Sequence, residues 1–283
     1  STPTGIPGQP RSVVAPQHFS LDLGLSKSRY RKALDFADAA QVDPVTRDNP
    51  LLLNVAGSVH LARGLSVYAA YTRGQEEALV APDIATNRSE APPALRTSQV
   101  EAGARWAVTP RLTLIAGAFS IRKPYYNLDP SLRYRQLGTL TNRGVELSLT
   151  GQLAPGLTVV SGSLFLDPTI SGEAVDSRLI GPRPVGQIRR RSVATLDWRM
   201  DGGHGPLSFD ATVESLSSRM GNAANTLLAP PRATLNLGAR YRFKMAGGTW
   251  LLRPVVLNAF NEYSWNVNAS GGFTYSNPRT VTL

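Results

Sequence analysis

Apolar and polar residues alternate along several stretches of the chain. From Val100 to Trp106 every second residue is apolar, and the residues between them are charged or glycine. The same alternation runs through residues 145–150, 207–214 and 233–243. Successive side chains of a β-strand point to opposite faces, so a period of two indicates strands with one apolar and one polar face. The pattern therefore predicts an all-β protein.

Extending this pattern along the chain predicts about twelve strands of a length suited to crossing a membrane. No window approaches 18 consecutive apolar residues, so no transmembrane helix is predicted. The expected strands are residues 18–32, 50–62, 65–74, 97–109, 112–123, 140–153, 157–167, 188–200, 207–219, 231–245, 249–263 and 273–283.

The connections between these strands alternate between short and long. Short turns are expected near residues 62–64, 109–111, 154–156, 201–206 and 246–248. Long loops are expected at residues 37–49, 74–96, 124–139, 168–186, 220–231 and 264–272. Short turns on one side and long loops on the other are typical of outer-membrane barrels. We therefore expect an antiparallel up-and-down transmembrane β-barrel, and no break in composition divides residues 1–283 into two domains.

Aromatic residues fall near the expected periplasmic ends of the strands, where an interfacial girdle belongs. The alternative is that they are ordinary core aromatics, because aromatic residues favour strands in any sheet. These residues are Trp106, Trp198, Tyr241, Phe243 and Trp250.

The charge balance and the reactive residue types exclude several functions. Thirty Lys and Arg against 20 Asp and Glu give a net charge of +10. The arginines stand singly, except in the run at residues 189–191, which is interpreted as a solvated strand end, so no nucleic-acid partner is predicted. The chain has no cysteine and three scattered histidines. No catalytic site, metal site or cofactor is predicted, and the protein is not expected to be an enzyme.

Several segments resemble the C-terminal barrel of TonB-dependent outer-membrane receptors of the siderophore-uptake type. Residues 95–105, LRTSQVEAGAR, are similar to the start of one strand of that family, and residues 111–123 follow as a rising strand. Residues 142–151, NRGVELSLTG, followed by Pro155-Gly156-Leu157, are the most specific piece. Residues 237–241 and 256–263 resemble strands near the C-terminal end of that family's barrel. The resemblance covers residues 50–283, and its segments occur in the same order as in the family.

The resemblance implies a 22-stranded barrel with a plugged lumen. The chain would then be a partial barrel of about twelve strands, without the plug domain and the earlier strands. The implied function is uptake of a ferric siderophore or similar chelate across the bacterial outer membrane, energised by TonB through the missing plug. The implied partners are the chelate, TonB and outer-membrane lipid. The alternative is a complete, small passive porin, since barrels close at even strand numbers from eight upward.

Candidate ligand contacts lie in the expected loop 124–139. Its tyrosines offer flat faces and its arginines offer positive charge, which suits an anionic, aromatic-rich chelate. The alternative is plain loop packing and surface charge. The candidate residues are Tyr125, Tyr126, Arg133, Tyr134 and Arg135.

A section of a larger barrel should be an open, curved sheet, with residues 18–32 and 273–283 as its edges. Its concave, polar face should carry Glu101, Arg105, Glu146, Asp210, Glu214, Arg240 and Arg242. Its convex, apolar face should carry Val100, Leu147, Phe209 and Leu237.

Overall fold

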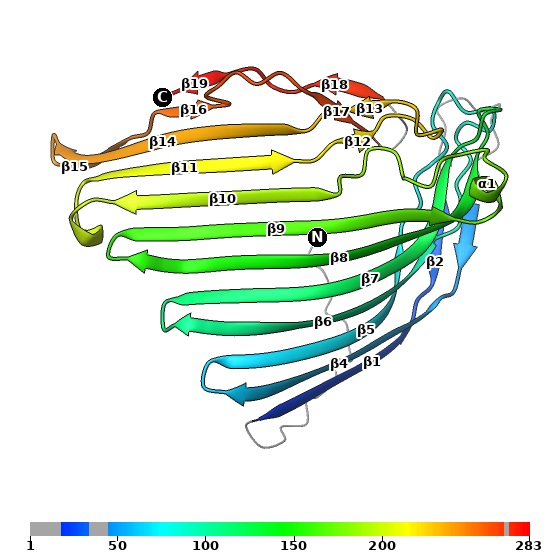
Figure 1. Ribbon diagram of the computed structural model, residues 1–283, viewed down its shortest axis with the longest axis horizontal. Coiled ribbons are helices and arrows are strands. Elements are labelled where there is room, and N and C mark those ends of the chain that lie inside the picture. Colours follow the sequence, from blue (N-terminus) through cyan, green and yellow to red (C-terminus); the bar gives the residue numbers. More distant parts are fainter. Residues whose placement is uncertain (1–17, 34–44, 269–271) are drawn as a thin grey trace.

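The computed structural model describes residues 18–33, 45–268 and 272–283, and these residues form one large antiparallel sheet of 13 strands. The all-β prediction is confirmed (Figure 1). In spatial order the sheet contains β1 (Phe19–Lys27), β4 (Leu51–Ala62), β5 (Leu65–Glu76), β6 (Leu95–Thr109), β7 (Leu112–Leu128), β8 (Tyr134–Ala154), β9 (Leu157–Ser171), β10 (Arg190–Arg199), β11 (Leu207–Leu216), β14 (Arg232–Met245), β16 (Val255–Leu257) and β19 (Thr280–Thr282), with β15 (Gly248–Leu252) also paired to β14.

The smaller elements are three two-stranded pairs and two short helices. The pairs are β2 (Tyr30–Ala33) with β3 (Val45–Asp48), β12 (Arg219–Met220) with β13 (Leu228–Ala229), and β17 (Trp265–Val267) with β18 (Phe273–Tyr275). The helices are α1 (Glu173–Asp176) and the 3-10 turn η1 (Asp201–Gly203). No helix in the described ranges is long and apolar enough to cross a membrane.

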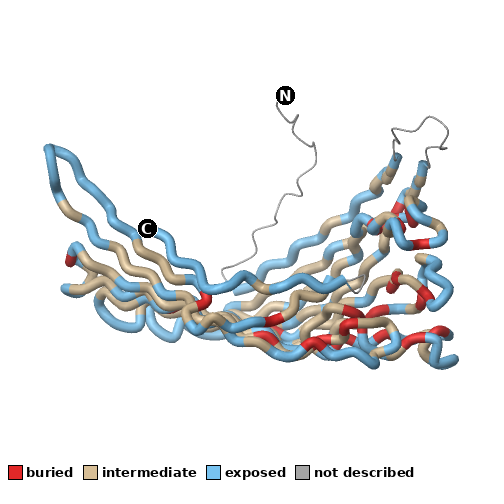
Figure 2. Tube along the Cα trace, turned by 90° about the horizontal axis from the view of Figure 1, so that it is seen from above, coloured by how far each residue is buried: buried red, intermediate tan, exposed pale blue. Residues whose placement is uncertain are grey.

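The sheet is open. Its order begins at β1 and ends at β19, and these two strands do not pair with each other in the described part of the chain. Figure 2 shows the resulting curved trough, with both flanks of the sheet rising on the same side. Figure 1 shows short turns at one end of the strands and the longer connections at the other. The expected partial barrel and the expected asymmetry of its connections are therefore confirmed.

The two faces of the sheet separate polar from apolar residues as predicted. Directly paired residues of an antiparallel sheet share a face. Leu147 pairs with Ala116 and Ser163, whereas Glu146 pairs with Gly117 and Leu164. Following the pairing from strand to strand places all the predicted polar residues on one face and all the predicted apolar residues on the other.

Among the residues that the structure describes, no protein layer covers the apolar face. Val100 is 56% exposed and Leu147 is 43% exposed, and Phe209 and Leu237 are similarly open. On the polar face, Arg240 contacts both Asp197 and Asp210, which joins β10, β11 and β14 by ion pairs. A water-soluble sheet would cover its apolar face, so the arrangement is that of a sheet whose apolar side meets lipid.

Glycines on the polar face lie beneath aromatic rings from the neighbouring strand. Tyr68 of β5 pairs with Gly103 of β6, and Phe119 of β7 pairs with Gly144 of β8. A Cβ atom at Gly103 would lie 2.7 Å from Cζ of Tyr68, and one at Gly144 would lie 2.7 Å from Cζ of Phe119. The missing side chains therefore make room for rings that lie along the sheet.

Four of the five expected girdle aromatics are exposed, whereas Phe243 is partly buried and stacks on Tyr241. Trp106, Trp198, Tyr241 and Trp250 are each about half exposed, so they are not core residues. Trp198 also stacks on Phe209 with ring centroids 6.1 Å apart. Large amphipathic rings exposed near the short turns suit the level of the lipid headgroups.

Several predicted boundaries were wrong. Residues 124–139 are not a loop, because β7 continues to Leu128 and β8 begins at Tyr134. The expected strand 249–263 divides into β15 and β16 at Pro254, since proline has no N–H to donate to a ladder. The expected strand 273–283 divides into β18, which pairs with β17, and β19, which joins the sheet. The expected strand 18–32 likewise divides into β1 and β2, and part of the expected loop 37–49 lies outside the described residues.

Candidate ligand cavity

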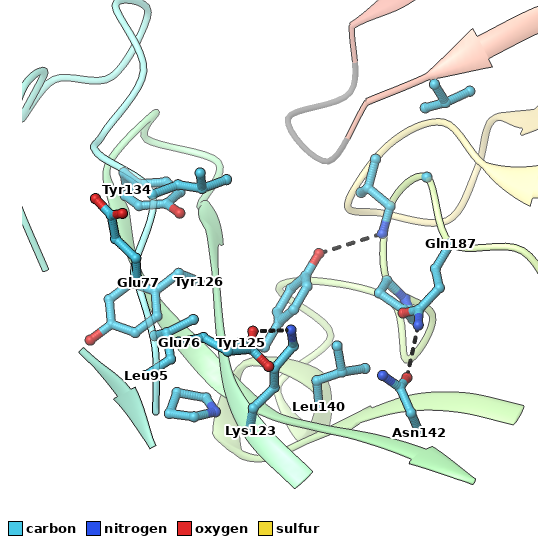
Figure 3. A pocket seen from close by; sticks show the side chains of 16 residues that line it. Glu76, Glu77, Leu95, Lys123, Tyr125, Tyr126, Tyr134, Leu140, Asn142 and Gln187 are labelled. Atoms are coloured by element: carbon cyan, nitrogen blue, oxygen red, sulfur yellow. Dashed lines mark hydrogen bonds and ion pairs between the residues drawn. The ribbon is translucent and has the colours of Figure 1, made fainter. Parts of the chain in front are cut away.

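A cavity of about 440 Å³ lies at the long-loop end of the sheet, on its polar side. Its floor is formed by the ends of β7 and β8, and its walls come from the β5–β6 and β9–β10 connections (Figure 3). The residues that line it include Glu76, Glu77, Lys123, Tyr125, Tyr126, Tyr134, Asn142, Val185 and Gln187.

Tyr125 fixes one wall of the cavity. Its side chain is 8% exposed, and its hydroxyl oxygen accepts hydrogen bonds from Nδ2 of Asn127 at 2.8 Å and from the backbone N–H of Val185 at 3.5 Å. Burial raises the pKa of Tyr125, so the phenol stays protonated at neutral pH. The side chain thus connects the β7–β8 hairpin to the β9–β10 connection (Figure 3).

Tyr126 and Tyr134 present partly exposed rings to the cavity. Their ring centroids are 6.0 Å apart, with 40° between the ring planes. Both rings also line a neighbouring cavity of about 290 Å³. The backbone of Tyr134 is held by Asn87, whose Oδ1 accepts the Tyr134 N–H at 2.8 Å and whose Nδ2 donates to the Tyr134 carbonyl at 2.9 Å. The β5–β6 connection therefore fixes the position of this aromatic pair.

The charged groups around the cavity are paired. Nζ of Lys123 lies 2.7 Å from Oε2 of Glu76, and Nζ of Lys32 lies 2.8 Å from Oε1 of Glu77. Opposite them, Nε2 of Gln187 donates to Oδ1 of Asn142 at 2.9 Å. The cavity thus offers aromatic faces, amides and neutralised ion pairs.

Arg133 and Arg135 do not line this cavity. Nε of Arg135 donates to Oδ2 of Asp129 at 2.7 Å, and the backbone N–H of Arg133 donates to Oδ1 of Asp129 at 3.0 Å. The Arg135 guanidinium and the Ser131 hydroxyl hold the pKa of Asp129 well below its usual range. The two arginines therefore belong to the tip of the β7–β8 hairpin.

The five candidate residues lie on one hairpin, as the sequence grouped them, but only the three tyrosines face the cavity. Sequence analysis missed Lys123, Asn142 and Gln187, which come from predicted strands or from distant loops. Alternating polarity cannot show which strand end a distant loop will cover. Contact of any of these residues with a ligand stays a prediction. In the ranges that the structure describes, no group of His, Cys, Asp and Glu is arranged to hold a metal ion.

Residues 13–270 match the family described as TonB dependent receptor-like, beta-barrel. The chain belongs to this family. The predicted resemblance and the outer-membrane location are confirmed with it, and the alternative of a small passive porin is not supported.

Individual relatives agree with this assignment. The chain is 30% identical over 200 residues to the ferrichrome receptor FcuA of Yersinia enterocolitica, which covers 70% of this chain and 26% of that protein. It superposes with a TM-score of 0.75 and 26% identity on BauA, the ferric preacinetobactin receptor of Acinetobacter baumannii, over 94% of this chain and 40% of that one. The ferric yersiniabactin uptake receptor FyuA of Yersinia pestis shares the fold, with a TM-score of 0.68 and 18% identity over 93% of this chain and 42% of that one.

The chain spans about a quarter of the curated relative and about two fifths of these structures. The family is one of transport receptors.

Proposed function

We propose that the chain is the C-terminal part of the barrel of an outer-membrane receptor that takes up a ferric siderophore. The observation that carries this proposal is the cavity of about 440 Å³ at the long-loop end of the polar face. In an outer-membrane barrel the long loops lie outside the cell, so this cavity faces the medium from which a chelate arrives.

The chemistry of the cavity supports a chelate as its occupant. Partly exposed aromatic rings and amides bind organic ligands through apolar contact and a few oriented hydrogen bonds. We assign ligand contact to Tyr126 and Tyr134, and a supporting role to Tyr125, whose hydroxyl is occupied within the protein. Arg133 and Arg135 would act only at the outer rim, because Arg135 is paired with Asp129.

The names of the relatives support an iron chelate as substrate. The curated relative is a ferrichrome receptor, and the 26%-identical structure is a ferric preacinetobactin receptor. Transport would draw its energy from TonB through a plug domain that occupies the lumen of the whole receptor. The barrel then needs no hydrolytic chemistry, so we propose that the protein is not an enzyme.

Uptake of radioactive iron tests this function. The full-length receptor is expressed in cells that lack their own siderophore receptors, with and without TonB, and is offered a panel of ferric siderophores. We expect at least one chelate to be taken up only when TonB is present. Uptake that is equal with and without TonB would indicate a passive pore. If no ferric chelate is taken up, the proposed function is wrong.

A further inference from the structure

A second, smaller cavity adjoins the first. It has a volume of about 190 Å³ and is lined by three arginines, Arg183, Arg189 and Arg219, together with Ser217 and Ser218. It shares Pro184 and Gln187 with the larger cavity, so the β9–β10 connection separates the two. The backbone of this connection is anchored here, because the N–H of Gly186 donates to the carbonyl of Met220 at 2.8 Å.

Arg219 is a buried cation that forms no ion pair with a carboxylate of the described residues. It is 8% exposed, and its Nη2 donates to the carbonyl of Trp265 at 3.2 Å. Its buried Nε has no hydrogen-bond partner within the part of the chain that the structure describes. Burial and the nearby charge of Arg232 lower the pKa of Arg219, and the Glu214 carboxylate offsets only part of this effect. A buried charge is costly unless it is paired, so the site lacks a compensating negative group.

Two carboxylates lie near the three arginines, and one of them, Glu214, is already paired with Arg191 at 2.8 Å. Arg189 lies 3.4 Å from Asp167, and both side chains are more than half exposed, which makes that pair weak. In the part of the chain that the structure describes, neither Arg183 nor Arg219 forms an ion pair. Because Arg191 neutralises Glu214, the three guanidinium groups with the weakly held Asp167 leave an excess of about two positive charges at neutral pH.

We propose that Arg183, Arg189 and Arg219 form a binding site for a phosphate group, separate from the chelate cavity. A phosphate monoester carries a charge of about −1.5 to −2 at pH 7, which matches the excess. Guanidinium groups bind phosphate oxygens through paired N–H donors, and unlike ammonium groups they do so with a fixed geometry. The phosphate comes either from the headgroup of an outer-leaflet lipid or from a soluble phosphate ester.

Binding of inorganic phosphate to the full-length receptor tests the site directly. The receptor is purified in detergent, stripped of lipid, and titrated with phosphate by calorimetry. Arg183→Gln and Arg189→Gln change exposed side chains, and Asn225 holds the backbone of residue 183 in either case, so both variants should fold. Arg88→Gln, which removes an exposed arginine from the β5–β6 connection, is the matched control.

We expect the double variant Arg183→Gln/Arg189→Gln to weaken phosphate binding by tenfold or more, since it removes two of the three charge-assisted donors. Arg219→Lys keeps the charge and loses the paired donors, so its affinity should lie between those of the wild type and the double variant. Arg88→Gln should bind as the wild type does. No phosphate binding by the wild type, or equal losses in the double variant and in Arg88→Gln, would overturn the proposal.

A second measurement identifies the source of the phosphate. Receptor extracted gently from outer membranes is assayed for copurified lipid phosphate. Lipid phosphate that the wild type retains and the double variant loses assigns the site to a lipid headgroup. Equal lipid content in both proteins, together with the difference in phosphate affinity, assigns it to a soluble phosphate. Neither measurement uses an iron chelate, so the phosphate site and the proposed uptake function can fail separately.

Discussion

Leu147 and Ser148 are neighbours on β8 that face opposite sides of the sheet, so the same charge at each site should affect stability differently. Leu147→Arg places a charge on the apolar face, and Ser148→Arg places the same charge on the polar face. The two sites are adjacent, so they share depth, strand and distance from the turn. A difference in stability between the two variants is therefore due to the face of the sheet on which the arginine lies.

The position of Leu147 sets the expected magnitude. It precedes Ala154, the last residue of β8, by seven residues. At about 3.3 Å per residue and a tilt of about 40°, it lies roughly 18 Å above the turn, within an apolar band about 25 Å tall. An arginine facing lipid costs about 2–4 kcal/mol at the midplane and less toward the interfaces. We therefore expect about 2 kcal/mol for Leu147→Arg, a change of roughly 30-fold in the folding equilibrium constant.

Ser148→Arg should change the free energy of unfolding by less than about 0.5 kcal/mol, as for an ordinary surface substitution. Its neighbour across the strand pair is Gly162, which has no side chain, and the nearest atom to a Cβ there is 4.0 Å away, so the longer side chain has room. Both variants of the full-length receptor would be unfolded with urea in lipid vesicles, with Leu147→Met as an apolar control. Equal destabilisation by the two arginines would refute the assignment of the faces.

Three further predictions concern packing, the cavity and the hairpin tip. Gly103→Ala should lower the free energy of unfolding by about 1–3 kcal/mol, because its Cβ would lie 2.6 Å from the Ala116 carbonyl oxygen. Gly162→Ala should be tolerated, because the nearest atom to its Cβ would be 4.0 Å away. Thermal denaturation of both variants checks this. Tyr126→Ala and Tyr134→Ala should each raise the Kd for the transported chelate about tenfold in a binding titration, whereas Arg133→Ala should not; equal effects would show that the rim binds the ligand. The pKa of Asp129 is lowered in the folded protein. The stability that the ionised Asp129 side chain contributes is therefore fully present above the usual carboxyl pKa near 3.9, and it is lost only as the pH falls through the lowered pKa of the folded state. The protection factors of the hairpin-tip amides, which compare each exchange rate with the intrinsic rate at the same pH, should therefore be equal at pH 7 and pH 5. Asp129→Ala should lower them at both pH values, and lower protection of the wild type at pH 5 than at pH 7 would contradict this.

The strands of the sheet and the face of each residue were predictable, because they depend on the polarity of residues that are adjacent in the sequence. Alternation along each strand fixes which residues share a face, and it placed Glu146 and Leu147 correctly without any knowledge of their neighbours. The same rule failed at Tyr125 and Tyr126. They belong to a hairpin that extends beyond the expected membrane-spanning part of β7, and there neither face needs to be uniformly apolar.

The cavity was only partly predictable, because it depends on contacts between distant segments. Tyr125 and Val185 are 60 residues apart, and Asn142 and Gln187 are 45 residues apart. Loop composition indicated the tyrosines, since aromatic residues in a long connection often bind ligands. It could not show that Arg135 is paired with Asp129 six residues earlier, because an ion pair needs a defined turn between its members.

Cross-linking between the two edge strands tests most directly whether this sheet is a section of a larger barrel. The chain has no cysteine, so introduced pairs give an unambiguous signal. Val256→Cys/Val281→Cys joins the paired strands β16 and β19 and serves as the positive control. Leu23→Cys/Val281→Cys places thiols on the same face of β1 and β19. In the full-length receptor in outer membranes, we predict that a short thiol cross-linker joins the first pair and leaves the second pair free. Efficient cross-linking of residues 23 and 281 would show that β1 and β19 are neighbours in a small closed barrel, which would contradict the account.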